Sequence, residues 1–194
     1  KTLRPTSDIY PQNVSMVVAL QGSGTPKPAD LKGKKIGVYS LASGTRQALQ
    51  VLLHSAGLTE ADVTVVVTGV LNFAPLMQGQ VDATAATDTG LLVGRRRGLP
   101  AVNVMEVGAV LPASSDLFVV REEVYQARRA ALQRFLRGYR DAAAWMIAQP
   151  EEAAQLAARR AIDGNDPALN LEMIRLRNAG SVSAIPPRPG LGPT

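Results

Sequence analysis

Hydroxyl-bearing residues and a glycine lie together at Ser43-Gly44-Thr45, between a short apolar strand and an amphipathic helix. The first N–H groups of a helix have no partner inside the helix, so they suit an anionic or strongly polar ligand group. Gly44 lets a ligand approach the backbone, and Ser43 and Thr45 add hydroxyls. Ser40, three residues before Ser43, is included in this candidate ligand-binding set. The plainer alternative is an ordinary helix N-cap.

Two more turns carry polar residues. Asn72 and Phe73 lie on a strand-to-helix turn, where Asn72 is the expected N-cap and Phe73 either covers a ligand or plugs the core. Thr87 and Asp88 follow another strand. Ligands of open parallel sheets bind outside the carboxyl ends of the strands. The sequence therefore predicts that the three turns converge on one binding site.

The residue inventory argues against catalysis and metal binding. The 194-residue chain has no cysteine, and its single histidine is His54. Cysteine nucleophiles, thiolate metal sites and histidine-rich metal sites are therefore excluded. His54 lies near the expected end of a helix, where a histidine is ordinary. We expect no metal and no cofactor, and an enzyme is the least favoured class.

Composition and charge indicate a folded globular protein that does not bind nucleic acid. Apolar residues make up 46% of the chain, aromatic residues 4%, and the net charge is +5. Arg95, Arg96 and Arg97 are the densest basic run, but cations at a helix C-terminus are common because they interact with the helix dipole. Aromatic residues are too sparse for a base-stacking surface. No apolar run reaches the roughly 18 residues that a membrane span needs.

The hydropathy pattern alternates between strands and helices before becoming helical. This predicts an α/β fold whose mainly parallel sheet has flanking helices. Pro150 is expected to stop one long helix, and 62–69 is expected to be a buried strand. The expected strands are 14–20, 35–39, 62–69, 81–87, 101–107 and 116–120. The expected helices are 44–56, 72–80, 88–97, 124–146, 151–162 and 168–178.

Three segments together resemble type II periplasmic substrate-binding proteins of ABC importers. The first is "PADLKGKKIGVYSLASGTRQALQVLLHSAGL", residues 28–58. The second is "LMQGQVDA", residues 76–83. The third is the expected strand and long helix that begin with "SSDLFVV", residues 114–120, and lead to "PEEAA", residues 150–154. The most similar group is the one that takes sulfonates, nitrate or thiamine pyrimidine precursors.

This resemblance implies a two-lobed receptor that closes about a hinge on a small polar or anionic molecule and delivers it to a membrane permease. It assigns 1–27 to a lobe-one strand and hinge, 28–115 to lobe two, and 116–194 to the return into lobe one. It implies a bacterial periplasmic or lipid-anchored location. The chain starts without Met and ends in "IPPRPGLGPT", so we expect a sequence cut at both ends. A homodimer through exchanged lobe-one elements is a further expectation.

Other members of the same fold group stay open as alternatives. The effector-binding domain of a LysR-type transcription regulator has the same two-lobed fold. Receptors of tripartite secondary transporters share the "SGTR" helix start, found here at 43–46. The fungal pyrimidine-synthase branch uses a cysteine-rich motif that this chain lacks. The glutamate that pyrimidine binders often place after the 81–87 strand is also absent, which weakens a pyrimidine assignment.

Overall fold

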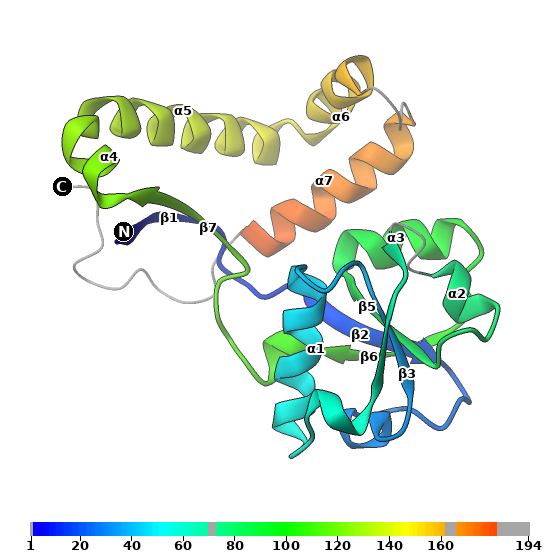
Figure 1. Ribbon diagram of the computed structural model, residues 1–194. Coiled ribbons are helices and arrows are strands. Elements are labelled where there is room, and N and C mark those ends of the chain that lie inside the picture. The colour runs from blue at the N-terminus through cyan, green and yellow to red at the C-terminus, as the bar shows by residue number, and fades with distance from the viewer. Residues whose placement is uncertain (1, 70–72, 162–165, 182–194) are drawn as a thin grey trace. The chain divides into compact units, whose positions relative to one another are not determined.

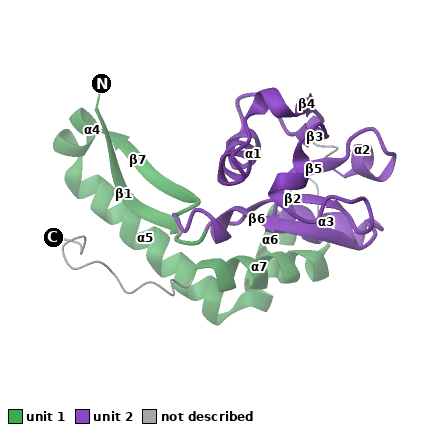
Figure 2. Ribbon diagram, turned by 90° about the horizontal axis from the view of Figure 1, so that it is seen from below, with its two compact units in different colours: residues 1–12, 114–194 green, residues 13–113 purple. Residues whose placement is uncertain are grey.

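The computed structural model describes residues 2–69, 73–161 and 166–181, and the chain divides into two compact units. Unit 1 comprises Lys1–Gln12 and Ser114–Thr194, and unit 2 comprises Asn13–Ala113. Figure 2 colours the two units separately.

Unit 2 is an α/β unit built on a five-stranded sheet with the order β4-β3-β5-β2-β6. The strands are β2 (Ser15–Leu20), β3 (Lys35–Val38), β4 (Thr64–Val67), β5 (Ala83–Thr87) and β6 (Val102–Glu106). The helices are α1 (Gly44–Ser55), α2 (Ala74–Met77) and α3 (Asp88–Arg96), with short 3-10 turns η1 (Pro28–Leu31), η2 (Glu60–Asp62) and η4 (Val107–Ala109).

The sheet is mixed, with one strand reversed. β3 pairs in parallel with both β4 and β5, whereas β2 pairs antiparallel with β5 and β6. Four strands therefore run in one direction and β2 runs in the other. The expected α/β fold is confirmed, and the reversed strand is internal, between β5 and β6, with Met16 to Ala19 all buried.

Helices cover both faces of the sheet, which produces two cores (Figure 1). On one face, the apolar stripe of α1, which includes Leu49 and Leu53, packs against Val17, Ile36 and Ala85. On the other face, residues of α2, α3 and their turns pack against Met16, Val18 and Ala86; they are Phe73, Leu76, Val81, Leu91 and Leu99. The side chains of a strand point alternately to the two faces, so neighbouring residues of β2 contribute to different cores.

The expectation of a buried strand at 62–69 is wrong. β4 is the edge strand of the sheet, its Val65 and Val66 are only half-buried, and Val67 is 54% exposed. A run of β-branched residues indicates a strand, but it does not distinguish a central strand from an edge strand.

Unit 1 combines a two-stranded antiparallel ribbon with helices. β1 (Leu3–Tyr10) pairs with β7 (Asp116–Arg121), and the helices are α4 (Glu122–Ala127), α5 (Arg129–Ala148), α6 (Pro150–Arg160) and α7 (Pro167–Ser181). The Phe118 ring of β7 meets the rings of Phe135 and Tyr139 of α5 edge-on, at centroid distances of 5.3 and 4.9 Å. These aromatic contacts join the ribbon to α5.

Two details of unit 1 differ from expectation. The single long helix is divided at Arg128, whose φ of −129° and ψ of 29° are not helical, so α4 ends before α5 begins. The stop near Pro150 is confirmed, because α5 ends at Ala148 and Pro150 starts α6. β1 was not expected from the sequence, since its alternating polar residues and Pro5 give little apolar periodicity.

The unit boundary also differs near the N-terminus. We expected residues 1–27 to lie in lobe one, but β2 is inserted between β5 and β6 of unit 2, which begins at Asn13. The apolar run 14–20 indicates a strand, but nothing in its sequence says which sheet the strand enters. Near the other boundary, unit 2 ends at Ala113, where we expected 115.

Candidate functional site

The candidate site lies at the carboxyl edge of unit 2, between β3 and β5. These neighbouring parallel strands lead in opposite directions: β3 continues through α1 to β4 at one edge of the sheet, and β5 continues through α3 to β6 at the other. Such a divergence is a topological switch point, and ligands of open α/β sheets bind just outside it. The turns that start at Ser40 and at Thr87 follow these two strands.

The Ser40–Thr45 loop is held by its own hydroxyls. Ser43 Oγ donates to the Ser40 carbonyl at 2.6 Å and accepts from the Ser40 N–H at 3.2 Å. The Thr45 hydroxyl lies 2.7 Å from Ser43 Oγ and accepts from the Tyr39 N–H at 3.0 Å. A carbonyl can only accept, so the single Ser43 proton is used there, and the Thr45 proton goes to Ser43. Both hydroxyl protons are therefore used inside the loop.

Other donors of this loop are still available for a ligand. Within the part of the chain that the structure describes, the N–H groups of Gly44 and Thr45 and the hydroxyl of Ser40 have no recorded partner. A Cβ placed on Gly44 would meet nothing within 4 Å, so the space at this helix start is open. Ser43 occupies the N-cap position, but its side chain does not cap the helix. The N-cap alternative is therefore right for the position of Ser43, whose carbonyl accepts from the Arg46 and Gln47 N–H groups, but not for its hydroxyl.

Thr87 does act as an ordinary helix cap. It is the N-cap of α3, and its hydroxyl accepts from the Gly90 N–H at 3.3 Å. Asp88 Oδ1 accepts from the Thr89 N–H at 2.7 Å, and the Asp88 N–H donates to the Val14 carbonyl. Both residues lie at the same sheet edge as Ser40, but these contacts are sufficient to explain their residue types.

The structure places Phe73 in the core. Its side chain is buried with Leu76 and Leu91, and a Cβ on Gly94 would come within 2.8 Å of its ring. The hydrophobic-plug alternative therefore holds, and the ring is not available to cover a ligand. Asn72 lies outside the described residues.

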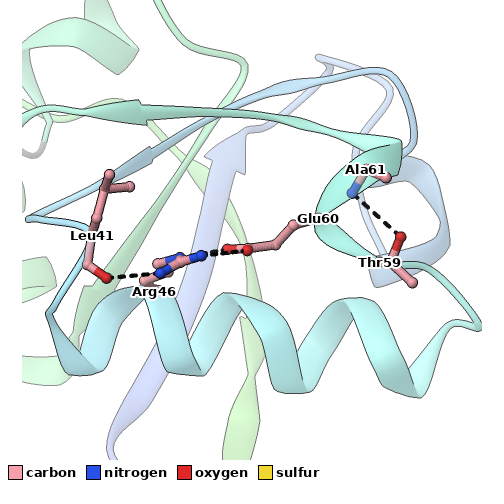
Figure 3. A network of polar contacts seen from close by, with 5 residues as sticks. All are labelled: Leu41, Arg46, Thr59, Glu60 and Ala61. Carbon is pink, nitrogen blue, oxygen red and sulfur yellow. Dashed lines mark hydrogen bonds and ion pairs between the residues drawn. The ribbon is translucent and has the colours of Figure 1, made fainter.

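An ion pair supports the loop, and sequence reasoning missed it (Figure 3). Arg46 binds Glu60 through Nε at 2.8 Å and Nη2 at 2.7 Å, and its Nη1 donates to the Leu41 carbonyl at 3.0 Å. This hydrogen bonding lowers the pKa of the Glu60 carboxyl and raises the pKa of the Arg46 guanidinium. Glu60 lies on η2, beyond the end of α1, so helical spacing could not reveal the pair.

Apolar side chains flank the loop. Tyr39 and Leu41 are 46% and 57% exposed, and Val67 lies at the end of β4 paired with Val38. The edge therefore presents polar backbone donors beside apolar surface, an arrangement that suits an organic molecule with a polar group.

The described residues contain neither a candidate metal centre nor a candidate membrane-spanning helix. Within residues 2–69, 73–161 and 166–181, no group of three or more His, Cys, Asp or Glu side chains could hold a metal ion. Among the helices of those segments, none combines the length and apolar character needed to cross a bilayer.

An α/β unit with a switch point at its carboxyl edge, joined to a second unit, is the fold that this chain shares with a solved periplasmic binding protein. The chain belongs to the NMT1/THI5-like family, whose sequence model matches residues 4–153. The resemblance to type II substrate-binding proteins is thus confirmed for family and fold.

Individual relatives are similar over most of this chain but only part of their own. A Haemophilus influenzae protein whose name assigns it to thiamine biosynthesis is 32% identical over 149 residues, 73% of this chain and 45% of its own length. The riboflavin-binding protein RibY of Chloroflexus aurantiacus is 27% identical over 66% of this chain and 36% of its own. The chain thus spans less than half of either relative.

A solved structure supports the fold. The periplasmic aliphatic sulphonate binding protein SsuA of Escherichia coli superposes with a TM-score of 0.72 at 22% identity. The match covers 89% of this chain and 53% of that protein. At this identity the likeness establishes the fold alone.

Proposed function

We propose that the protein is a solute-binding receptor that captures a small polar or anionic organic molecule and delivers it to an ABC-type importer. The observation that carries this proposal is the switch point between β3 and β5, where the Gly44 and Thr45 N–H groups and the Ser40 hydroxyl are available. Family membership supports it, because relatives and similar folds include named binding proteins for riboflavin and sulfonates. No bond is made or broken in this function.

The proposed ligand class is a thiamine pyrimidine precursor, a sulfonate or nitrate. Unpaired N–H groups at a helix start suit the oxygens of a sulfonate or nitrate, or the ring acceptors of a pyrimidine. The exposed apolar surface of Tyr39 and Leu41 favours a ligand with an organic body over bare nitrate. Ser40, Gly44 and Thr45 would contact the ligand directly, Ser43 would shape the loop, and Thr87 and Asp88 would line the edge.

The remaining expectations follow from a receptor role. The partner is a membrane permease, and the site of action is outside the cytoplasmic membrane, with the protein free in the periplasm or lipid-anchored. Binding would bias the two lobes toward a closed state that the permease recognises. The proposed homodimer would form by exchange of lobe-one elements between two copies, for which the β1–β7 ribbon, with Leu3, Leu117 and Val119 exposed, is the candidate element.

Thermal unfolding against a panel of compounds tests the receptor proposal. The panel contains the thiamine pyrimidine precursor, riboflavin, taurine, an alkanesulfonate and nitrate. A ligand present at a hundred times its dissociation constant adds about 2.7 kcal/mol to the free energy of unfolding. A saturable rise in Tm with one compound class supports the receptor and identifies its ligand. An unchanged Tm with all of them would count against this ligand class and favour the effector domain of a regulator.

A further inference from the structure

The turn between β3 and α1 has little packing to hold it in place. Its central residues, Leu41 and Ala42, are both exposed, so no buried side chain anchors the turn. Fixing a backbone that gains no burial costs conformational entropy, which only hydrogen bonds can offset here. The Ser43 hydroxyl and the Ser43 N–H both bind the Ser40 carbonyl and close the turn at its ends.

The middle of the turn is held by Arg46 alone among the described residues. Its Nη1 donates to the Leu41 carbonyl at 3.0 Å, and no other recorded hydrogen bond reaches that oxygen. The same guanidinium is fixed on its other side by both oxygens of Glu60, at 2.8 and 2.7 Å. A planar guanidinium can make these three bonds at once, whereas a lysine ammonium cannot match this arrangement.

We propose that Arg46 is a positioning residue for the binding loop: held by Glu60, it fixes the Leu41 carbonyl and so sets the conformation of residues 40–45. Its positive charge is already paired with the Glu60 carboxylate, and its positioning role needs no contact with the ligand. The significance of this role rests on the proposed function, but the role itself can be measured without any ligand.

Amide hydrogen exchange of the ligand-free protein tests the role of Arg46. The variants are Arg46→Lys, which keeps the charge, and Glu60→Ala, which releases the guanidinium. Both should speed exchange of the Tyr39, Ser40 and Ser43 amides, the hydrogen-bonded amides of residues 39–45, by about threefold or more, because local opening of the turn becomes easier. Exchange in residues 47–55, which form the rest of α1, should not change. The double variant should resemble the singles, since both act through one contact.

A matched control is available in unit 1. Arg4 binds Glu122 through Nε at 2.6 Å and Nη2 at 3.1 Å, a similar two-point pair with no recorded bond to a backbone carbonyl. Arg4→Lys should leave exchange in residues 39–45 unchanged. Wild-type exchange of this loop in Arg46→Lys, or equal acceleration along all of α1, would overturn the proposal. A negative ligand panel would affect only the proposed function, so the two failures are distinguishable.

Discussion

A single methyl group added at Gly94 should destabilise unit 2 because of Phe73. An ideal Cβ at this position would lie 2.8, 3.0 and 3.1 Å from three carbons of the Phe73 ring. The ring is buried among Leu76 and Leu91, so it cannot swing away. Overpacking of this kind costs about 1 to 3 kcal/mol. Replacing glycine by alanine in a helix returns about 0.5 to 1 kcal/mol.

The expected net loss for Gly94→Ala is therefore about 0 to 2.5 kcal/mol, a fall in Tm of up to about 10 °C for a chain of this size. Compared with an alanine placed on the same helix without a clash, the loss is the full overpacking cost of about 1 to 3 kcal/mol. Gly90→Ala is the matched control, because it lies on the same helix and its Cβ would meet only Thr87 Oγ1, at an ordinary 3.4 Å. It should leave the Tm unchanged or raise it. Thermal unfolding followed by circular dichroism measures both.

Phe73→Leu supplies the second arm of this test. A smaller side chain at position 73 removes the atoms that the new methyl group meets, so Gly94→Ala should cost less in the Phe73→Leu background. A coupling of about 0.5 kcal/mol or more is expected. If Gly94→Ala proves as stable as Gly90→Ala, or if the coupling is absent, then the packing of Phe73 against α3 described here is incorrect.

The site supports three more predictions. Ser40→Ala should weaken ligand binding by about 1 kcal/mol, for one lost hydrogen bond, and should leave the Tm of the ligand-free protein unchanged, because the Ser40 hydroxyl has no recorded partner within the described residues. Titration calorimetry measures the affinity and thermal unfolding measures the Tm; a lowered Tm with normal affinity would contradict this prediction. Ser43→Ala should lower Tm even without ligand, because this hydroxyl closes the turn at 2.6 Å; a wild-type Tm would show that the hydroxyl is not needed for the loop. The destabilisation caused by Glu60→Gln should be largest at neutral pH and should shrink under acid. The hydrogen bond from Arg46 holds the folded-state pKa of Glu60 below the ordinary value of a glutamate, about 4.3. The ionised carboxylate therefore stabilises the fold fully above that ordinary value, and this stabilisation is lost as the pH falls through the folded-state pKa. A loss of Tm that is the same at pH 7 and pH 3 would argue against an ionised Glu60.

The sequence predicted the elements that place the site more reliably than the contacts within it. The apolar stripe of α1 and the Ser-Gly-Thr turn located the helix start correctly, because periodicity and turn chemistry are local properties. Of the three turns predicted to converge, those after β3 and β5 end at one edge, because the two strands are parallel neighbours. In the third turn, Phe73 is in the core and Asn72 lies outside the described residues. Thr87 could have been recognised as a cap from its place before α3.

What the sequence did not reveal depends on contacts between distant residues. The pairing of Arg46 with Glu60 requires η2 to fold back beside α1. The burial of Phe73 depends on Gly94, twenty-one positions later, having no side chain. The entry of β2 into the sheet of unit 2 is set by its pairing with β5 and β6, and an apolar strand sequence is compatible with many partners.

The most direct test of the proposed binding site is an NMR titration of the ¹⁵N-labelled protein with the compounds of the panel. We predict that one of them shifts the amide signals of Gly44 and Thr45 saturably, with a dissociation constant that agrees with the rise in Tm. Saturable binding that leaves both of these amides unmoved would contradict the assignment of the carboxyl edge between β3 and β5 as the ligand site.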